Sequence, residues 1–327
     1  SLDQHVGRGA GPNAAGTMNP VVAHALTLWG LSDAQVHLVA KRENEVFRVT
    51  ATTGQSLALR LHRPGYRNDA ELRAELQWMA ALATGGLNVP APVPALDGVA
   101  LQRVEDTQVS MLSWLNATPL GMLGVLLNVP NRLETFHALG VEMAKLHDVS
   151  DRWAPPAGFE RWSWDRTGLL GDAPLWDRFW ENPTLDRDLR ELLIRFRQHA
   201  LARLSTEQES LDFGLIHADL VPENVMRAED GTLYMIDFDD GGFGFRLFDI
   251  ATALIKHRVE PDFTDLRAAL IEGYQSQRTL DVGGLEFFMA LRAVTYVGWI
   301  ITRMGEDGAP ARNKRFLAQA KALISAL

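Results

Sequence analysis

The chain has 327 residues, more than a single compact core usually holds, and its 46% hydrophobic and 22% charged content is typical of a globular protein. It has no cysteine, which excludes disulfides, thiolate nucleophiles and cysteine-based zinc sites. The net charge is −9, and nucleic-acid-binding proteins are usually basic, so we expect no nucleic-acid partner.

The first residues, 1–18, are rich in Gly and Ala and show no periodic pattern, so we interpret them as an N-terminal extension. They contain no apolar core of a signal peptide. We therefore expect a cytoplasmic protein with no membrane partner.

A helix is predicted from Pro20, with Asn19 as its N-cap and Gly30 at its end. Three β-like runs follow, and Thr53-Gly54 marks a turn between the last two: residues 34–40, 44–51 and 55–62. A helix with one apolar face is then predicted over 69–83.

Another strand pair is predicted before the pattern changes at Trp114, over residues 98–104 and 107–115. Beyond it the sequence is mostly helical: residues 132–149, residues 185–204 and three stretches after Arg246, with short strands at 212–217 and 232–238. Residues 287–304 are strongly apolar, but Arg292 interrupts them, which favours a buried core helix over a membrane span.

The order of these elements indicates an α+β fold with two lobes. The prediction is a β-rich N-lobe over residues 19–114 and a mainly helical C-lobe over residues 115–327.

The stretch "LIHADLVPENVM" places His217, Asp219 and Asn224 within one turn, and Asp237 follows at the end of an apolar strand. Phosphoryl transfer needs such a set, because one carboxylate must orient the attacking hydroxyl. An Asn and a second Asp can supply the hard oxygen ligands that Mg²⁺ prefers.

Two other interpretations use the same residues. His217 and Asp219 alone would fit an ordinary surface turn, and a metal hydrolase could use the same acids. The carboxylates of Asp237, Asp239 and Asp240 at one strand end repel one another unless a cation neutralises them, which favours a cation site. No cluster of His or Cys at zinc spacing accompanies them.

The sequence resembles the kinase-like phosphotransferases, which include aminoglycoside phosphotransferases, choline kinases and type II homoserine kinases. His217, Asp219 and Asn224 match the H-x-D-x-x-x-x-N loop of that group. Residues 236–239 match its I-D-[FW]-[DE] strand, and Gly244 with residues 249–251 matches the helix start that follows. The resemblance extends over about residues 20–325 and implies a protein-kinase-like fold with ATP and Mg²⁺ as cofactors.

The resemblance implies a role for each matched residue. Asp219 is the catalytic base, and Asn224 and Asp237 are Mg²⁺ ligands. Asp239 is a further metal ligand or a substrate contact. His217 and Asp249 are implied as structural support for the loop.

The resemblance implies that the N-lobe binds the nucleotide. This lobe departs from the family pattern, because Arg60 stands where kinases of this fold have a lysine. Its expected ion-pair partner is Glu75, with Glu71 as the rival, and an ordinary strand–helix ion pair is the alternative interpretation. A polar turn around Asn44 replaces the glycine-rich loop.

The remaining expectations concern adenine and the acceptor. Backbone groups of Ser113 and Leu115 are expected to meet adenine. Asp240 and Glu223 are candidates to attract a substrate ammonium. Trp164 belongs to an aromatic cluster that could cage such a group, although core packing is the favoured interpretation of the cluster.

The predicted function is an ATP- and Mg²⁺-dependent kinase that phosphorylates a hydroxyl of a small molecule, such as homoserine, an amino alcohol or an aminoglycoside. A protein Ser/Thr kinase of the same fold and a nucleotide-binding regulatory pseudoenzyme are the alternatives. The sequence decides neither the acceptor nor the oligomeric state.

Overall fold

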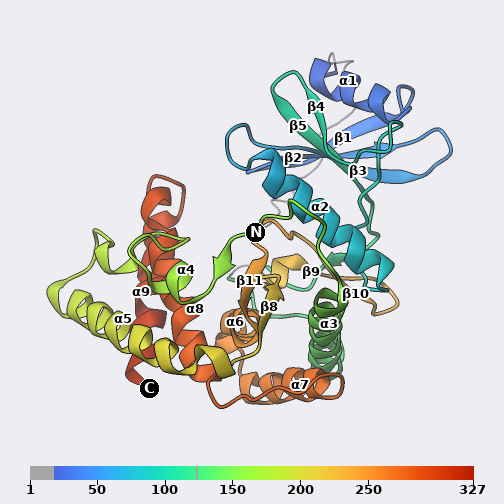
Figure 1. Ribbon diagram of the computed structural model, residues 1–327. Helices are drawn as coiled ribbons and strands as arrows, with labels where there is room; N and C mark the ends of the chain where they lie inside the picture. The colour runs from blue at the N-terminus through green and yellow to red at the C-terminus, as the bar shows by residue number, and fades with distance from the viewer. Residues whose placement is uncertain (1–17, 123) are drawn as a thin grey trace. The chain divides into compact units, whose positions relative to one another are not determined.

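The computed structural model describes residues 18–122 and 124–327 (Figure 1). The predicted N-terminal extension lies outside the described residues except for Met18. The chain divides into two compact units. The first contains the chain through Val129 with Arg152–Glu160 and Pro222–Asp239, and the second contains Pro130–Asp151, Arg161–Val221 and Asp240–Leu327.

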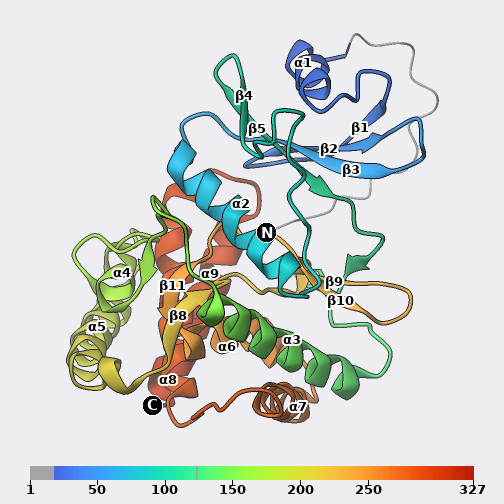
Figure 2. The same ribbon diagram turned by 45° about the vertical axis from the view of Figure 1, so that its right-hand side comes forward.

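A five-stranded antiparallel sheet dominates the first unit, in the order β1-β2-β3-β5-β4. Its strands are β1 (Gln35–Lys41), β2 (Glu45–Thr50), β3 (Ser56–Leu61), β4 (Gln102–Val104) and β5 (Thr107–Ser113). On β3, every second residue is buried, as expected for a sheet that covers a core on one face. That face packs against α1 (Pro20–Leu28), which contributes Val22, Leu26 and Ala25 to the same core (Figures 1 and 2).

Helix α2 (Asp69–Thr84) begins where the side chain of Asn68 accepts a hydrogen bond from the N–H of Glu71 (2.8 Å). Its Trp78 is fully buried and meets Phe238 edge to face. A second sheet of this unit has the order β10-β9-β6. It consists of β6 (Thr118–Pro119), β9 (Val225–Arg227) and β10 (Leu233–Met235), with the 3-10 turn η3 (Pro222–Asn224) before β9.

The second unit is mainly helical, with one small sheet in the order β7-β11-β8. Its strands are β7 (Ser163–Trp164), β8 (Phe213–Ile216) and β11 (Gly242–Phe245). Its α-helices are α3 (Arg132–Arg152), α4 (Arg166–Leu170), α5 (Arg187–Glu207), α6 (Arg246–Ile255), α7 (Phe263–Gln275), α8 (Leu285–Trp299) and α9 (Ala309–Ser325). Its 3-10 turns are η1 (Phe179–Glu181), η2 (Gln208–Ser210), η4 (Lys256–Val259) and η5 (Ile301–Arg303). Helices α8 and α9 run side by side in both ribbon views (Figures 1 and 2).

The long helices and strands predicted from the sequence are confirmed, with three differences. Four α-helices follow β11, one more than predicted. The strand predicted over 98–104 is reduced to β4, because Gly98 closes a turn at a φ of 83°. The strand predicted over 232–238 ends at Met235, because Asp237 has a φ of 61°.

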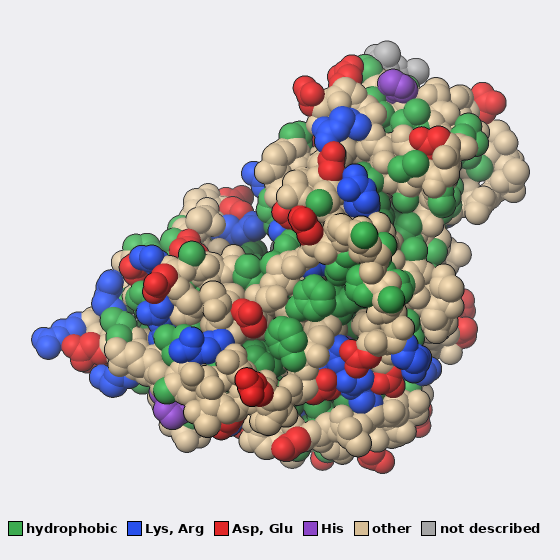
Figure 3. All heavy atoms as spheres, viewed as in Figure 1, with side chains coloured by type: hydrophobic (Ala, Val, Ile, Leu, Met, Phe, Trp, Pro, Cys, Tyr) green, Lys and Arg blue, Asp and Glu red, His purple; other side chains and the backbone are tan. Residues whose placement is uncertain are grey.

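The apolar stretch that includes α8 is a core helix, as predicted. Among the described residues, Leu285–Arg303 is the one helical stretch long and apolar enough to cross a membrane, yet 78% of its most apolar window is buried inside the protein. On the face shown in Figure 3, acidic and basic side chains are interspersed rather than gathered by sign.

Candidate active site

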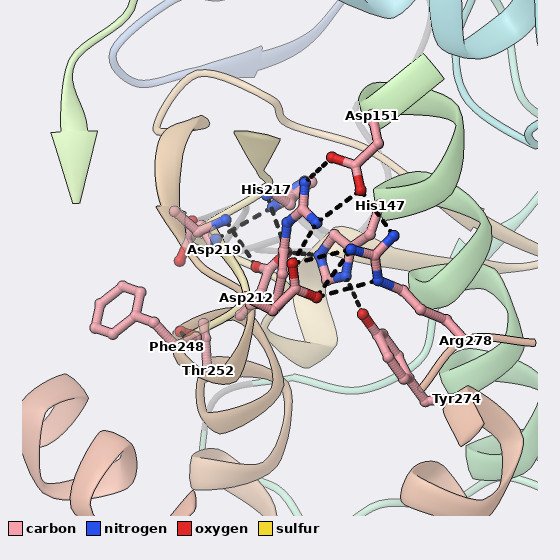
Figure 4. Close-up of polar contacts among 12 residues, drawn as sticks. His147, Asp151, Asp212, His217, Asp219, Phe248, Thr252, Tyr274 and Arg278 are labelled. Carbon is pink, nitrogen blue, oxygen red and sulfur yellow. Dashed lines mark hydrogen bonds and ion pairs between the residues drawn. The ribbon is translucent and has the colours of Figure 1, made fainter. Parts of the chain in front are cut away.

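One buried carboxylate, that of Asp249, holds the loop of His217 and Asp219, both of which are labelled in Figure 4. Asp249, on α6, accepts hydrogen bonds from the N–H groups of His217 (3.1 Å) and Ala218 (2.9 Å). Ala218 has a φ of 67°, a left-handed conformation that costs roughly 1–2 kcal/mol for a residue with a Cβ. Nδ1 of His217 then accepts a hydrogen bond from the N–H of Asp219 (3.1 Å). The loop is therefore held in a strained conformation by bonds to Asp249.

Two more helices support Asp249. Nε2 of His147 on α3 lies 2.8 Å from Oδ2 of Asp249, and its Nδ1 lies 2.7 Å from the hydroxyl of Tyr274 on α7. Burial acts to raise the pKa of Asp249, but the hydrogen bonds from His147 and the Ala218 amide outweigh it, so this pKa lies below its ordinary value. Burial lowers the pKa of His147. An ionised Asp249 beside a neutral His147 assigns the proton to Nε2, and the Tyr274 hydroxyl then donates to Nδ1.

An ion-pair network fixes the start of α6 (Figure 4). The buried guanidinium of Arg246 lies 2.7 Å from Asp151 and 3.2 Å from Asp212. Arg278 contacts the same two carboxylates at 2.8 Å. A Cβ on Gly214 would overlap Nη2 of Arg246, so the glycine on β8 makes room for the network. No sequence pattern indicates this network, because its members are dispersed along the chain.

Asp219 lies beside a buried cation. Nη2 of Arg292, on α8, is 3.6 Å from Oδ1 of Asp219, and the side chain of Arg292 is completely buried. The sequence signal for Arg292 was its position as a charge within an apolar run.

The aromatic cluster of the second unit packs its core. The ring of Trp164 is stacked on Phe248, with 5.6 Å between centroids, and meets Trp176 edge to face at 5.2 Å. Trp164 is 1% exposed, and its Nε1 donates to the carbonyl of Asp240 (2.9 Å), which also accepts from Trp162 (3.0 Å). The core-packing interpretation is confirmed for Trp164.

The first unit brings together the groups predicted to hold phosphates. Nη1 of Arg60 lies 2.8 Å from Oε1 of Glu75, and its Nε donates to Ser110 (3.1 Å). Glu71, the rival partner, instead lies 3.7 Å from Arg67. Within the described residues, the buried Nη2 of Arg60 has no hydrogen-bond partner. Such a donor costs about 1–3 kcal/mol and calls for an explanation such as a ligand.

A neutral histidine adjoins this ion pair. Nε2 of His62 lies 2.9 Å from the hydroxyl of Ser110. Burial, helped by the charge of Arg60, lowers the pKa of His62 to about 3. His62 therefore adds no second positive charge beside Arg60 near neutral pH.

Asp239 is paired with an arginine of the same unit. Nε and Nη2 of Arg67 lie 3.2 and 3.3 Å from the two carboxylate oxygens. Burial raises the pKa of Asp239 against the opposing charge of Arg67, and the nearby carboxylates of Glu75 and Asp237 add to the rise. A metal ion at Asp239 would compete with Arg67 for this carboxylate.

Asn224 and Asp237 are linked through the backbone. The carbonyl of Asn224 accepts a hydrogen bond from the N–H of Ile236 (3.0 Å), the residue before Asp237. Both Asn224 and its neighbour Glu223 are buried. No group of three or more His, Cys, Asp or Glu with metal-binding geometry occurs in the described part of the chain. An amide oxygen and a carboxylate still form a donor set of the kind that Mg²⁺ prefers.

The other predicted nucleotide residues lie at turns and strand ends of the first unit. Oδ1 of Asn44 accepts a hydrogen bond from the N–H of Arg63 (3.2 Å), which joins the β1–β2 turn to the end of β3. Ser113 closes β5 and accepts a hydrogen bond from the N–H of Ala91 (2.9 Å). Leu115 follows β5 and is half-buried.

A small antiparallel sheet, a helical region and an H-x-D-x-x-x-x-N loop followed by an aspartate define the class of kinase-like phosphotransferases. Residues 36–287 match the phosphotransferase enzyme family, and the chain belongs to this family. The family and the α+β, kinase-like fold expected from the sequence are confirmed.

Three known proteins illustrate the relationship. A homoserine kinase of Acidiphilium cryptum (strain JF-5) is 29% identical over 246 residues, which cover 71% of this chain and 70% of the relative. The structure of a microcompartment-associated aminopropanol kinase matches with a TM-score of 0.79 and 30% identity, over 93% of this chain and 96% of that one. Amicoumacin kinase hAmiN, solved with AMP-PNP, Ca²⁺ and Ami, shares the fold with a TM-score of 0.71 and 20% identity, over 94% of this chain and 92% of that one.

These similarities show that the protein is an ATP-dependent small-molecule kinase, which transfers a phosphoryl group to a hydroxyl. The predicted enzyme class is confirmed.

Proposed function

We propose that Asp219 orients and deprotonates the acceptor hydroxyl. This role is supported by the hydrogen bonds that hold the loop of Asp219 in place. Asp249 fixes the backbone of His217 and Ala218, and His217 fixes the N–H of Asp219. A base held in this way places its carboxylate without reorganisation during the reaction.

Asn224 and Asp237 would hold Mg²⁺, which supplies positive charge against the phosphates of ATP. Their hard oxygen donors support this role, and the Ca²⁺ in the hAmiN structure agrees with a divalent ion in this fold. Asp239 is a weaker candidate ligand, since Arg67 engages both of its oxygens.

Arg60 would bind phosphate oxygens through its Nη2, while Glu75 holds the other arm of the guanidinium. The backbone of the turn at Asn44 would lie over the phosphates. Backbone groups of Ser113 and Leu115, at the end of β5 and just after it, would meet adenine.

The proposed acceptor is a small amino alcohol, and the protein is proposed to work in the cytoplasm. The similarity to aminopropanol kinase supports the acceptor, because it extends over 93% of the chain at 30% identity. Homoserine, which has a carboxylate as well as the amine, is the second candidate on the strength of the homoserine kinase relative. Asp240 and Glu223 would attract the ammonium of either compound.

The test is ADP release from Mg·ATP with aminopropanol, ethanolamine, choline, homoserine, an aminoglycoside and a generic protein as acceptors. We expect release with an amino alcohol, and a loss of about 10²–10⁴-fold in Asp219→Asn, the range of general-base catalysis. Thermal stabilisation by Mg·ATP should persist in Asp219→Asn and show that the nucleotide site is intact.

Each contrary result has a distinct meaning. Full turnover by Asp219→Asn would refute the role of Asp219. Turnover with the protein acceptor alone would favour the protein kinase alternative. Stabilisation by ATP without any turnover would favour the regulatory pseudoenzyme.

A further inference from the structure

Helix α8 contains one charge at its buried centre. From Phe287 to Gly298 every residue is buried, and Arg292 is the single charged residue of that stretch. Its side chain has 0% exposure. A buried cation loses its hydration, so its surroundings must compensate for that loss.

Four aromatic rings supply part of this compensation. The guanidinium carbon of Arg292 lies 4.4 Å from the ring centroid of Trp176, 4.6 Å from Tyr296, 5.1 Å from Phe248 and 5.9 Å from Trp164. Cation–π attraction is strongest when the cation is desolvated, as it is here. Trp164, which the sequence allowed as part of a cage for a ligand's ammonium, therefore lies beside the protein's own cation.

The rings provide no hydrogen-bond acceptor for the N–H groups of the guanidinium. None of Nε, Nη1 and Nη2 has a hydrogen-bond partner within residues 18–122 and 124–327. The carboxylate that pairs with Arg292 there is Asp219, with Nη2 3.6 Å from Oδ1. This separation exceeds an ordinary hydrogen bond, so the interaction is chiefly one of charge.

We propose that Arg292 is a positioning residue for Asp219. Its fixed positive charge attracts and orients the carboxylate of Asp219, and at 3.6 Å it does so without a hydrogen bond to that oxygen. The four aromatic rings hold the guanidinium in place, and they do so without forming hydrogen bonds to Asp219. This inference rests on the proposed role of Asp219.

The kinetic test compares Arg292→Met, which removes the charge, with Arg292→Lys, which keeps it. Arg312→Met is the matched control, because Arg312 also lies near a tryptophan ring, 5.7 Å from that of Trp299, and forms an ion pair with Glu306 at 3.2 Å. We expect Arg292→Met to lower kcat about 10- to 100-fold, as the loss of a charged contact does, with the KM for ATP nearly unchanged. Arg292→Lys should recover much of kcat, and Arg312→Met should match the wild type.

A wild-type kcat in Arg292→Met, or equal losses in the Met and Lys variants, would overturn the proposal. A rise in the KM for homoserine alone would also overturn it, because Arg292 would then bind the acceptor's carboxylate. The proposed function fails separately, if Asp219→Asn keeps full turnover.

A stability measurement keeps the test valid if Arg292→Met does not fold. Asp219→Asn leaves the buried cation without its carboxylate, so we expect a lower Tm than in the wild type. An equal or higher Tm would show that Arg292 does not depend on Asp219, and it would overturn the inference without reference to activity.

Discussion

The three nitrogen atoms of the Arg60 guanidinium have different surroundings. One arm is held by Glu75, the Nε is held by Ser110, and Nη2 is left for a ligand. A lysine carries its three donors on one nitrogen and lacks the rigid planar fork that spreads the donors of Arg60 over separate atoms. Arg60 is thus more than a replacement of one charge by another.

We predict that Arg60→Met raises the KM for ATP about 10- to 100-fold, the effect of losing a charged hydrogen bond. Arg60→Lys should retain the charge but not the fixed fork, and so give an intermediate KM. The control is Arg103→Met, which removes an exposed strand–helix ion pair with Asp69 in the same unit. An unchanged KM in Arg60→Met would mean that the ion pair with Glu75 is only structural.

The sequence predicted some of these residue contacts and missed others for a physical reason. Arg60 and Glu75 lie on a strand and a helix that are close in the chain, so their pairing could be expected. Arg67 and Asp239 are 172 residues apart, and no local pattern reports such a contact. The roles proposed for Asp219, Asn224 and Asp237 remain predictions.

At the scale of elements, helices α3 and α7 pack closely because each has a glycine where it meets the other. A Cβ on Gly140 of α3 would overlap the carbonyl of Leu270 on α7, and a Cβ on Gly273 of α7 would overlap the carbonyl of His137 on α3. Each glycine therefore accommodates the backbone of the other helix. These helices also carry His147 and Tyr274, which support the catalytic loop through Asp249.

We predict that Gly140→Ala and Gly273→Ala each lower the free energy of unfolding by about 1–3 kcal/mol, as overpacking of a close contact does. Urea unfolding measures the loss. The double variant should lose less than the sum, because both changes push the same two helices apart. Gly305→Ala is the control, since its Cβ would meet nothing within 4 Å. Equal, small effects in all three variants would contradict a tight α3–α7 contact.

The long elements could be predicted because their periodic patterns extend over several turns or strand residues, as in α2 and β3. The strands β6, β7 and β11 were not predicted. They have two to four residues each and exist because a partner strand supplies their hydrogen bonds. The division into an N-lobe and a C-lobe at residue 114 also remains a prediction.

For the molecule as a whole, buried histidines couple folding to pH. Burial lowers the pKa of His62 to about 3, that of His257 to about 4, and that of His147 below its ordinary value. Above pH 6.5 both the folded and the unfolded protein hold these rings neutral. Below pH 6.5 these histidines become protonated in the unfolded chain but stay neutral in the folded protein. The free energy of unfolding therefore falls as the pH drops toward 4.

We predict a lower urea midpoint at pH 5 than at pH 7.5, with about 2 kcal/mol lost for each of His62 and His257. His257→Gln should flatten this dependence, because it removes one of the groups that resist protonation. His24→Gln, at an exposed site on α1, is the control. An identical midpoint at the two pH values would show that these rings can be protonated within the folded protein.

The burial of α8 also constrains how the protein is made. Its aromatic neighbour Phe316 belongs to α9, where its ring stacks on Tyr296 of α8 at 5.2 Å. A ribosome releases α8 before α9, so the most membrane-like segment of the chain emerges ahead of a helix that shields it. Until α9 packs against it, α8 therefore exposes an apolar surface that the folded protein buries.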